Sequence, residues 1–340
     1  NLSIFNLGLG HSNGMLTLSI GSPDDYLYFE TESVEIGSLD SRTGVDLGDI
    51  LTFQILSSTP NGVMTELTIH VTDEDNYDHV STIELIIGEA MPIASYGFEE
   101  TDGWTVGDIG DDATAGIWES AVPVATFFDG NQAQPGSDYS EDGEKCFLTG
   151  ATTSPGSVGF DDVDGGKTTL LSPVFDLSEY NEALLSYWRW YTNNVGDNPG
   201  TDHWQVDVTS DGGQNWSQLE YTNESQDAWV QKNFLLSQIG IELTSQIQFR
   251  FIAEDITNPG DSGTGGSIVE AAIDDFSVSI FNTNPDLSGD LNEDGVLNVL
   301  DVVVMVNVVL ASDCPDSADM NADGVCNVLD VVILVNLILE

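Results

Sequence analysis

The sequence predicts a mostly β protein in which two tandem β-sandwiches are followed by a small α-helical module that binds calcium. Three observations support this fold class. Short apolar runs separated by Gly, Asn, Ser, Thr and Asp are typical of β-sandwiches, and they continue to about residue 283. Two acidic loops near the C-terminus each lead into an apolar stretch of helical length. No run of 18 or more apolar residues occurs, so the sequence predicts no membrane-spanning helix.

The composition is strongly acidic. Fifty-eight Asp and Glu residues stand against six Lys and Arg residues, which gives a formal net charge of −52. Such a surface repels nucleic acids and anionic membranes, so we expect no nucleic-acid partner and no membrane insertion. The chain begins at Asn1 without an initiator Met or a signal peptide. We therefore expect an internal or processed part of a longer secreted polypeptide, located outside the cell or at its surface.

Residues 1–88 are predicted to form the first sandwich. Turn clusters separate five expected strands: Leu2–Phe5, Met15–Ile20, Leu51–Ile55, Thr65–Val71 and Thr82–Ile87. Strands of this length and spacing indicate an immunoglobulin-like fold. The segment also resembles the immunoglobulin-like modules that follow the catalytic domains of gingipain-type and other secreted bacterial peptidases. The runs that carry this resemblance are Asn6-Leu7-Gly8, Leu16-x-Leu18-x-Ile20, Phe53-x-Ile55 and Pro60-x-Gly62.

Residues 93–283 are predicted to form a second, larger sandwich. Its landmarks are Phe98-Glu99, Gly103-Trp104, Leu185-Ser186-Tyr187-Trp188, Asp211-Gly212-Gly213 and the run from Glu270 to Phe276. In this order they resemble the MAM-like jelly rolls of secreted bacterial peptidases and adhesive ectodomains. The resemblance implies two packed antiparallel sheets and a further structural calcium ion between the first and last strands. The matching positions are Glu99 and Asp275, with Glu270 and Asp274 nearby; alternatively, these carboxylates cap strand ends in water.

Two twelve-residue loops, Asp290–Asp301 and Asp319–Asp330, predict calcium sites. Each places oxygen-bearing side chains at positions 1, 3, 5, 9 and 12 and a glycine at position 6, which is the ligand order of a calcium loop. The backbone carbonyl at position 7 is a further ligand. Two calcium ions are therefore expected. The ligands of the first are Asp290, Asn292, Asp294, Val296, Asn298 and Asp301, and those of the second are Asp319, Asn321, Asp323, Val325, Asn327 and Asp330.

The loops belong to an internal duplication, because Asp290–Leu310 and Asp319–Leu339 are identical at 14 of 21 positions. Residues 288–340 resemble the type I dockerin modules of secreted bacterial enzymes, which implies a cohesin partner. The residues that would contact a cohesin are Val299-Leu300 and Val328-Leu329, and the basic residues usual in the following turns are absent. Because both helices are apolar on nearly every side, we expect them to be buried against their own chain or a neighbouring subunit.

Cys314 and Cys326, twelve residues apart in this module, are expected to form a disulfide. We expect Cys146 to be a buried apolar residue. The alternative to the disulfide is that all three cysteines are free thiols. In the run Tyr187–Tyr191, alternate residues share one face of a strand, so one set belongs to the core. The other set could stack on a sugar ring or simply cover the sheet. Trp188 and Trp190 share one face and are the candidate sugar contacts.

No catalytic set is recognisable, since the four histidines stand in no fitting context and no phosphate-binding loop occurs. We predict that the chain is not an enzyme. It is expected to be a non-catalytic, calcium-stabilised accessory region of a secreted bacterial protein, a peptidase or another hydrolase, that serves extracellular attachment or assembly. The alternatives are a self-associating subunit of an extracellular filament or surface layer, and a carbohydrate-binding module with a polysaccharide partner.

Overall fold

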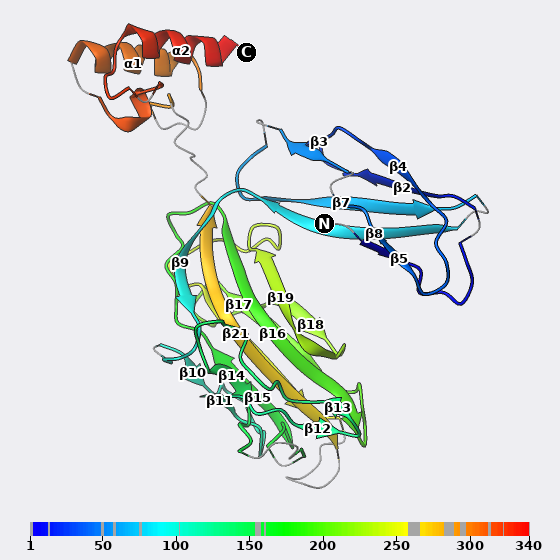
Figure 1. Ribbon diagram of the computed structural model, residues 1–340. Coiled ribbons are helices and arrows are strands. Elements are labelled where there is room, and N and C mark those ends of the chain that lie inside the picture. Colours follow the sequence, from blue (N-terminus) through cyan, green and yellow to red (C-terminus); the bar gives the residue numbers. More distant parts are fainter. Residues whose placement is uncertain are drawn as a thin grey trace. The chain divides into compact units, whose positions relative to one another are not determined.

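The computed structural model describes the chain except residues 1–2, 13, 49–50, 57–58, 75–76, 102, 154–157, 160, 258–265, 282–288, 293–296, 312–313, 322 and 340 (Figure 1). The chain divides into two compact units. One unit is Ala90–Phe281, and the other consists of Asn1–Glu89 together with Asn282–Glu340. The predicted domain limits of 1–88, 93–283 and 288–340 stay predictions.

In its described residues, the N-terminal segment is built from eight strands. They are β1 (Ser3–Phe5), β2 (Leu16–Gly21), β3 (Leu27–Phe29), β4 (Ser33–Gly37), β5 (Gly44–Asp46), β6 (Phe53–Ile55), β7 (Val63–Thr72) and β8 (Asp78–Ile87). The longest are β7 and β8, with ten residues each. An antiparallel sheet has the order β4-β2-β7-β8, and β1 pairs with β5 and β3 with β6. Leu18, Ile20, Leu47, Leu67 and Ile69 form the buried core of this segment. Its immunoglobulin-like classification stays a prediction.

The unit Ala90–Phe281 is a sandwich of two antiparallel sheets (Figure 1). The strands of the first sheet, in order, are β10 (Thr105–Val106), β15 (Gly166–Leu171), β20 (Gln248–Asp255), β17 (Trp204–Thr209) and β18 (Ser217–Thr222). Those of the second are β11 (Trp118–Ala121), β14 (Cys146–Thr149), β21 (Ser267–Phe281), β16 (Ala183–Gly196) and β19 (Gln226–Leu235), with β9 (Ala90–Tyr96) also paired to β21. A separate pair is β12 (Phe127–Phe128) with β13 (Asn131–Gln132).

Aromatic rings fill the core of this sandwich. Trp104 packs edge-on against Phe276, with ring centroids 4.9 Å apart and an interplanar angle of 88°, and against Phe98 at 5.0 Å. Such edge-to-face pairs add to the hydrophobic stabilisation that comes from burying the rings. Phe98 and Phe276 are completely or almost completely buried, and each is the direct neighbour of an acidic residue, Glu99 or Asp275. The core therefore holds the backbone on which those two carboxylates are carried.

The C-terminal module is helical, as predicted, and the mostly β fold class with a small helical module at its end is confirmed. It contains α1 (Val299–Ala311), the 3-10 turn η1 (Asp316–Ala318) and α2 (Val328–Leu339). Met305, Ala318 and Leu334, all fully buried, form the centre of its core. Within the described residues, no helix has both the length and the apolar character needed to cross a membrane.

Candidate metal centres

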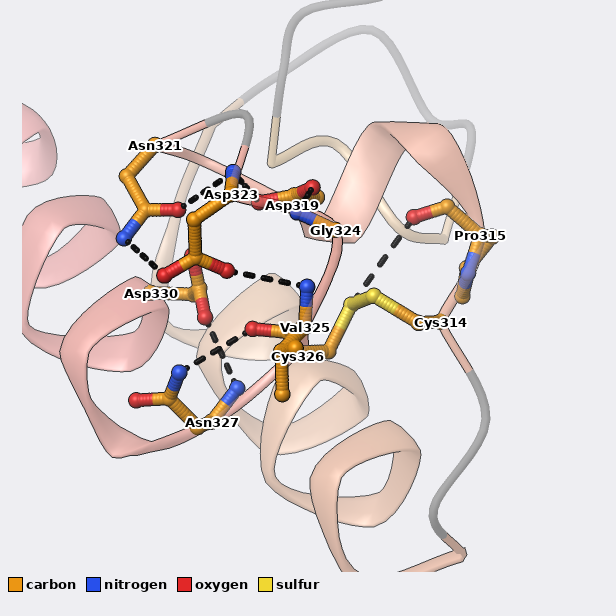
Figure 2. Close-up of a disulfide and its surroundings, with 10 residues drawn as sticks. All are labelled: Cys314, Pro315, Asp319, Asn321, Asp323, Gly324, Val325, Cys326, Asn327 and Asp330. Atoms are coloured by element: carbon orange, nitrogen blue, oxygen red, sulfur yellow. Dashed lines mark hydrogen bonds between the residues drawn. A yellow bond between two sulfur atoms is a disulfide. The ribbon is translucent and has the colours of Figure 1, made fainter.

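The second acidic loop is folded around its own carboxylates (Figure 2). Asp319 accepts hydrogen bonds from the N–H of Asp323 through Oδ1 (3.1 Å) and from the N–H of Gly324 through Oδ2 (2.7 Å). Asp323 Oδ1 in turn accepts from the N–H of Val325 at 2.9 Å. Gly324 has φ 81°, a left-handed conformation that glycine adopts without a steric penalty. The turn at position 6 therefore brings the side chains of positions 1 and 5 to the inside of the loop.

The last residue of this loop, Asp330, is also part of the helix that follows. Asp330 is fully buried, and its Oδ2 accepts a hydrogen bond of 2.7 Å from the N–H of Asn327. Asn327 Oδ1 accepts from the N–H of Leu329 at 2.8 Å, which caps the first turn of α2. The other carboxylate oxygen, Asp330 Oδ1, is buried and has no hydrogen-bond donor among the described residues. A buried carboxylate oxygen beside two further aspartates fits a bound cation, because a cation supplies the missing partner.

The first loop repeats this arrangement where it is described. Asp301 is fully buried and accepts hydrogen bonds from the N–H groups of Leu291 (3.0 Å), Asn292 (3.3 Å) and Asn298 (2.9 Å). Burial raises the pKa of Asp301, but these hydrogen bonds outweigh it and hold the pKa below its usual value. Asn298 Oδ1 caps α1 by accepting from the N–H of Leu300 at 2.8 Å. Of the predicted ligands, Asp294 and Val296 lie outside the described residues.

A disulfide joins the second loop to the segment before it. Cys314 and Cys326 are bonded, with Cα atoms 5.2 Å apart, and Cys326 is loop position 8 (Figure 2). The neighbouring Val325 offers its backbone carbonyl, which here accepts a hydrogen bond of 3.0 Å from Asn327 Nδ2. The disulfide therefore restrains the part of the loop that carries the position-7 carbonyl.

In the sandwich, three of the four predicted carboxylates gather around one turn, residues 138–144. Asp274 Oδ2 accepts from the N–H groups of Tyr139 (2.8 Å) and Ser140 (3.2 Å), and Asp275 Oδ1 accepts from Ser140 Oγ at 2.7 Å. Glu99 Oε1 accepts from the N–H groups of Glu144 (2.7 Å) and Lys145 (2.8 Å). Glu99, Asp274 and Asp275 thus contact the same turn from the two ends of the unit's sequence.

A β-bulge explains how two consecutive residues of β21 can face the same turn. Ser186 pairs with Ser277 and Trp188 with Asp274, so β21 holds one more residue than β16 in this interval. Asp275 has φ 45° and Phe98, next to Glu99, has φ 58°. Left-handed conformations are uncommon for such residues, and they concentrate at functional sites. The bulge redirects Asp275 to the side on which Asp274 lies.

Asp138 completes this group, and its role was not predicted. A Cβ atom built on Gly143 would lie 2.8 Å from Asp138 Oδ2 and 2.9 Å from Glu99 Oε1, so the two carboxylates converge on one point. Burial, followed by the charges of Glu99 and Asp275, raises the pKa of Asp138. Burial likewise raises the pKa of Asp274 to about 6. Converging oxygens whose charges disfavour one another fit a divalent cation with oxygen ligands.

Glu270 does not belong to this group. Although it lies on β21, its Oε2 accepts a hydrogen bond of 3.1 Å from Gln134 Nε2, and its pKa is raised by burial and then by the charge of Asp162. Four residues along a strand correspond to about 13 Å, which is too far for Glu270 and Asp274 to share one ion. The expectation that Glu270 lies near Asp274 at one site is therefore corrected.

The candidate sugar contacts differ in exposure. Trp190 is 5% exposed and donates from Nε1 to the carbonyl of Ala133 at 2.7 Å, so its ring is part of a buried cluster. Trp188 is partly exposed and stacks on Tyr139, with ring centroids 3.6 Å apart. Tyr187 and Tyr191, on the opposite face, are fully buried in the core. Of the two tryptophans, Trp188 is the more exposed.

Comparison with protein families identifies a match for the helical module. Residues 288–339 match the family model described as "Dockerin type I domain". This segment is a dockerin type I domain. The resemblance predicted from the duplicated loops is therefore confirmed, and it supports calcium binding by the dockerin together with a non-catalytic assembly or binding role. None of the curated proteins compared with the chain matches it.

Solved structures similar to the chain include two adhesin domains of Lys-gingipain from Porphyromonas gingivalis W83. The K1 cleaved adhesin domain is 16% identical, covers 54% of this chain and 96% of its own, and has a TM-score of 0.32. The K3 cleaved adhesin domain is 14% identical, with coverages of 55% and 98% and a TM-score of 0.32. A xylan-binding domain of family CBM 22 is 9% identical, with coverages of 57% and 97% and a TM-score of 0.30.

Within this single chain the dockerin helices are not buried on every side, and burial against a neighbouring subunit stays a prediction. Each buries one stripe, centred on Met305 in α1 and Leu334 in α2. The Val-Leu pair that opens each helix is exposed: Val299 is 67% and Leu300 56% exposed, and Val328 is 69% and Leu329 51% exposed. The duplication therefore presents the same apolar pair twice on the dockerin surface.

Proposed function

We propose that this chain is the non-catalytic accessory region of a secreted bacterial protein, and that its dockerin attaches that protein to a partner outside the cell. The parent is a peptidase or another hydrolase. The partner is a cohesin-type domain that contacts the exposed residues at the start of α1 and α2.

The observation that carries this proposal is the exposure of both Val-Leu pairs. Apolar side chains that remain exposed on a small folded module are typical of a protein interface. Asn298 and Asn327 cap the helices directly before these pairs, and Asp301 and Asp330 lie directly after them. Calcium binding in the loops would therefore fix the position of the residues that contact the partner, which makes attachment dependent on calcium.

Calcium has a structural role in this proposal. The dockerin holds two ions in its loops, and the sandwich holds one more at Glu99, Asp138, Asp274 and Asp275. The sandwich ion would join the turn 138–144 to β21 and to the segment that follows β9, and so stabilise the unit Ala90–Phe281.

Binding to a recombinant type I cohesin, measured by calorimetry, tests the attachment. We expect a complex in calcium that is lost in chelator and is weakened at least tenfold in the double variant Leu300→Asp, Leu329→Asp. Ile109→Asp is the matched control, because Ile109 is the same kind of exposed apolar residue (97%) but lies in the sandwich. Equal affinity for both variants would refute the assignment of this surface.

The same exposed helix residues support a second candidate, calcium-dependent self-association in an extracellular filament or surface layer. Sedimentation velocity of the full chain, in calcium and in chelator, separates the two functions. Polymers that form in calcium without any cohesin support the filament. A monomer under both conditions excludes it and leaves the attachment proposal standing.

A further inference from the structure

A second group of acidic residues lies in the unit Ala90–Phe281, away from the turn 138–144. Asp162 and Asp164 precede β15, Asp255 ends β20 and Glu270 lies on β21. All are buried, with exposed fractions of 2%, 2%, 0% and 1% respectively. Asp and Glu are rarely buried to this extent unless a partner compensates their charge.

The backbone brings these residues together from both sheets. Val163 donates its N–H to the carbonyl of Val269 at 3.0 Å, which sets Asp162 beside the start of β21, where Glu270 lies. Gly166 pairs with Asp255, and Ala115 forms an isolated bridge with Asp164. The group therefore lies where β15 and β21 begin and β20 ends.

Two buried oxygens at this place, Asp162 Oδ1 and Gln134 Oε1, accept no hydrogen bond from the residues that the structure describes. Gln134 is fully buried, and its Nε2 donates to the carbonyls of Thr149 (3.3 Å) and Gly150 (2.7 Å) and to Glu270 Oε2 (3.1 Å). These three acceptors fix the amide orientation, so the unpaired atom is an oxygen. An acceptor without a donor among carboxylates requires a partner that is positively charged or carries protons.

The neighbouring charges that raise the pKa values of Asp162 and Glu270 are negative. Burial, and then the charges of Asp164 and Asp255, raise the pKa of Asp162 to about 8. Burial and the charge of Asp162 raise the pKa of Glu270 well above its usual value. Without a counter-charge, the fold can hold these carboxyls only by protonating some of them. A bound cation would provide the counter-charge instead.

We propose that this group is a calcium site of the sandwich, distinct from the one at the turn 138–144. Asp162, Glu270 and the amide oxygen of Gln134 are its ligands, and Asp164 and Asp255 contribute negative charge. Oxygen atoms from carboxylates and an amide are the ligands that calcium prefers, and the set contains no sulfur or imidazole for zinc or copper. Among the described residues, no three Asp, Glu, His or Cys side chains are grouped so that they could hold a metal ion; the proposed set has two carboxylates and one amide oxygen.

Native mass spectrometry of the full chain at saturating calcium tests the proposal by counting ions. We expect Asp162→Asn and Glu270→Gln each to bind one ion fewer than the wild type, whereas Asp227→Asn, an exposed residue of β19, binds the full number. In chelator, Asp162→Asn should melt no lower than the wild type, because it removes one of the repelling charges. An unchanged ion count in both site variants would overturn the proposal in favour of protonated acids.

A second measurement does not depend on the stability of a single variant. All seven tryptophans lie between Trp104 and Trp229, and residues 288–340 contain no aromatic residue. Terbium emission excited through tryptophan therefore reports ions that lie close to the tryptophans of the unit Ala90–Phe281. Trp204 pairs with Ala253, two residues before Asp255, and is placed to sensitise this site. We expect emission to persist in Glu99→Gln and to be lost when Glu270→Gln is added; no emission in Glu99→Gln would contradict the second site.

Discussion

A hydrogen bond joins Asn327 to Asp330 at the boundary between the second acidic loop and α2. Asp330 Oδ2 accepts the N–H of Asn327 at 2.7 Å, and Asn327 Oδ1 caps the helix by accepting the N–H of Leu329. The residue that closes the proposed calcium site is thus also the residue that stabilises the first turn of the helix. Ion binding and helix formation are expected to depend on each other in this module.

Asp330→Asn should remove the second ion and loosen α2. The amide keeps the size of the side chain but removes a negative charge from the ion, and it leaves fewer acceptor sites for the N–H of Asn327. Hydrogen exchange followed by mass spectrometry should show faster exchange across 328–339 in calcium, while α1 changes less. The control is Asp227→Asn, and equally slow exchange in α2 of both variants would show that the two features are independent.

Asn327→Ala tests the cap separately from the carboxylate charge. Loss of a helix N-cap typically costs about 1 kcal/mol, and the exposed cap in α2 should follow this value. Chemical unfolding of the full chain in calcium, monitored at the dockerin by hydrogen exchange, measures the change. Asn307→Ala, in the middle of α1, has no capping role and is the matched control; a loss as large in Asn307→Ala would show that the effect is not capping.

Removal of the disulfide should weaken calcium binding at the second loop more than at the first. The bond spans 12 residues, and a link of this length stabilises a fold by about 3 kcal/mol in the chain-entropy account. When the double variant Cys314→Ser, Cys326→Ser is titrated with calcium, one of the two binding steps should therefore occur at a higher calcium concentration than in the wild type. The free thiol Cys146 is buried in the sandwich, so Cys146→Ala controls for the loss of a cysteine. Overlapping titration curves would show that the disulfide does not act on the loop.

Asp211 should make the stability of the fold depend on pH, and this dependence should not require calcium. Its carboxylate accepts hydrogen bonds from the N–H and side-chain amide of Asn215 and from Thr209 Oγ1, which lower its pKa to about 2. Because the folded pKa lies below the unfolded value, the carboxylate stabilises the turn above pH 4, and this contribution is lost as the pH falls through about 2. NMR titration of the carboxyl carbon should show a midpoint near 2, and Asp211→Asn should melt below the wild type at pH 7 only. A midpoint near 4 would contradict this.

The parts of the protein that sequence reasoning located best are those whose geometry is local. The loops 290–301 and 319–330 carry their ligands within twelve residues, so the order of residue types is sufficient to predict the turn. Asp138 was missed because it meets Glu99 and Asp275 only after folding; its neighbour Ser140 bonds to Asp275 across 135 residues of sequence. The cluster Asp138-Tyr-Ser-Glu-Asp-Gly was a signal for an acidic turn, but nothing in it indicates which strand it contacts.

There are also physical reasons why the sequence did not predict the position of Glu270 or the exposure of the helix residues. Glu270 and Asp274 lie on the same face of β21, as expected for residues four apart on a regular strand. They cannot bind the same ion because the distance between them along the strand is too long. The composition of α1 and α2 predicted all-round burial, yet a module of this size has too little core to cover two apolar helices. Only the stripes that include Met305 and Leu334 are covered, and the rest remains available to a partner.

The disulfide makes the two halves of the duplication unequal. Position 8 of the loop is Leu297 in the first copy and Cys326 in the second, so only the second loop is covalently anchored to the chain before it. A preorganised loop loses less conformational freedom when an ion arrives. The dockerin would then fill in a fixed order as calcium rises, with the second loop first and the first loop last. Its response to calcium would be graded over a range of concentrations rather than confined to a single threshold.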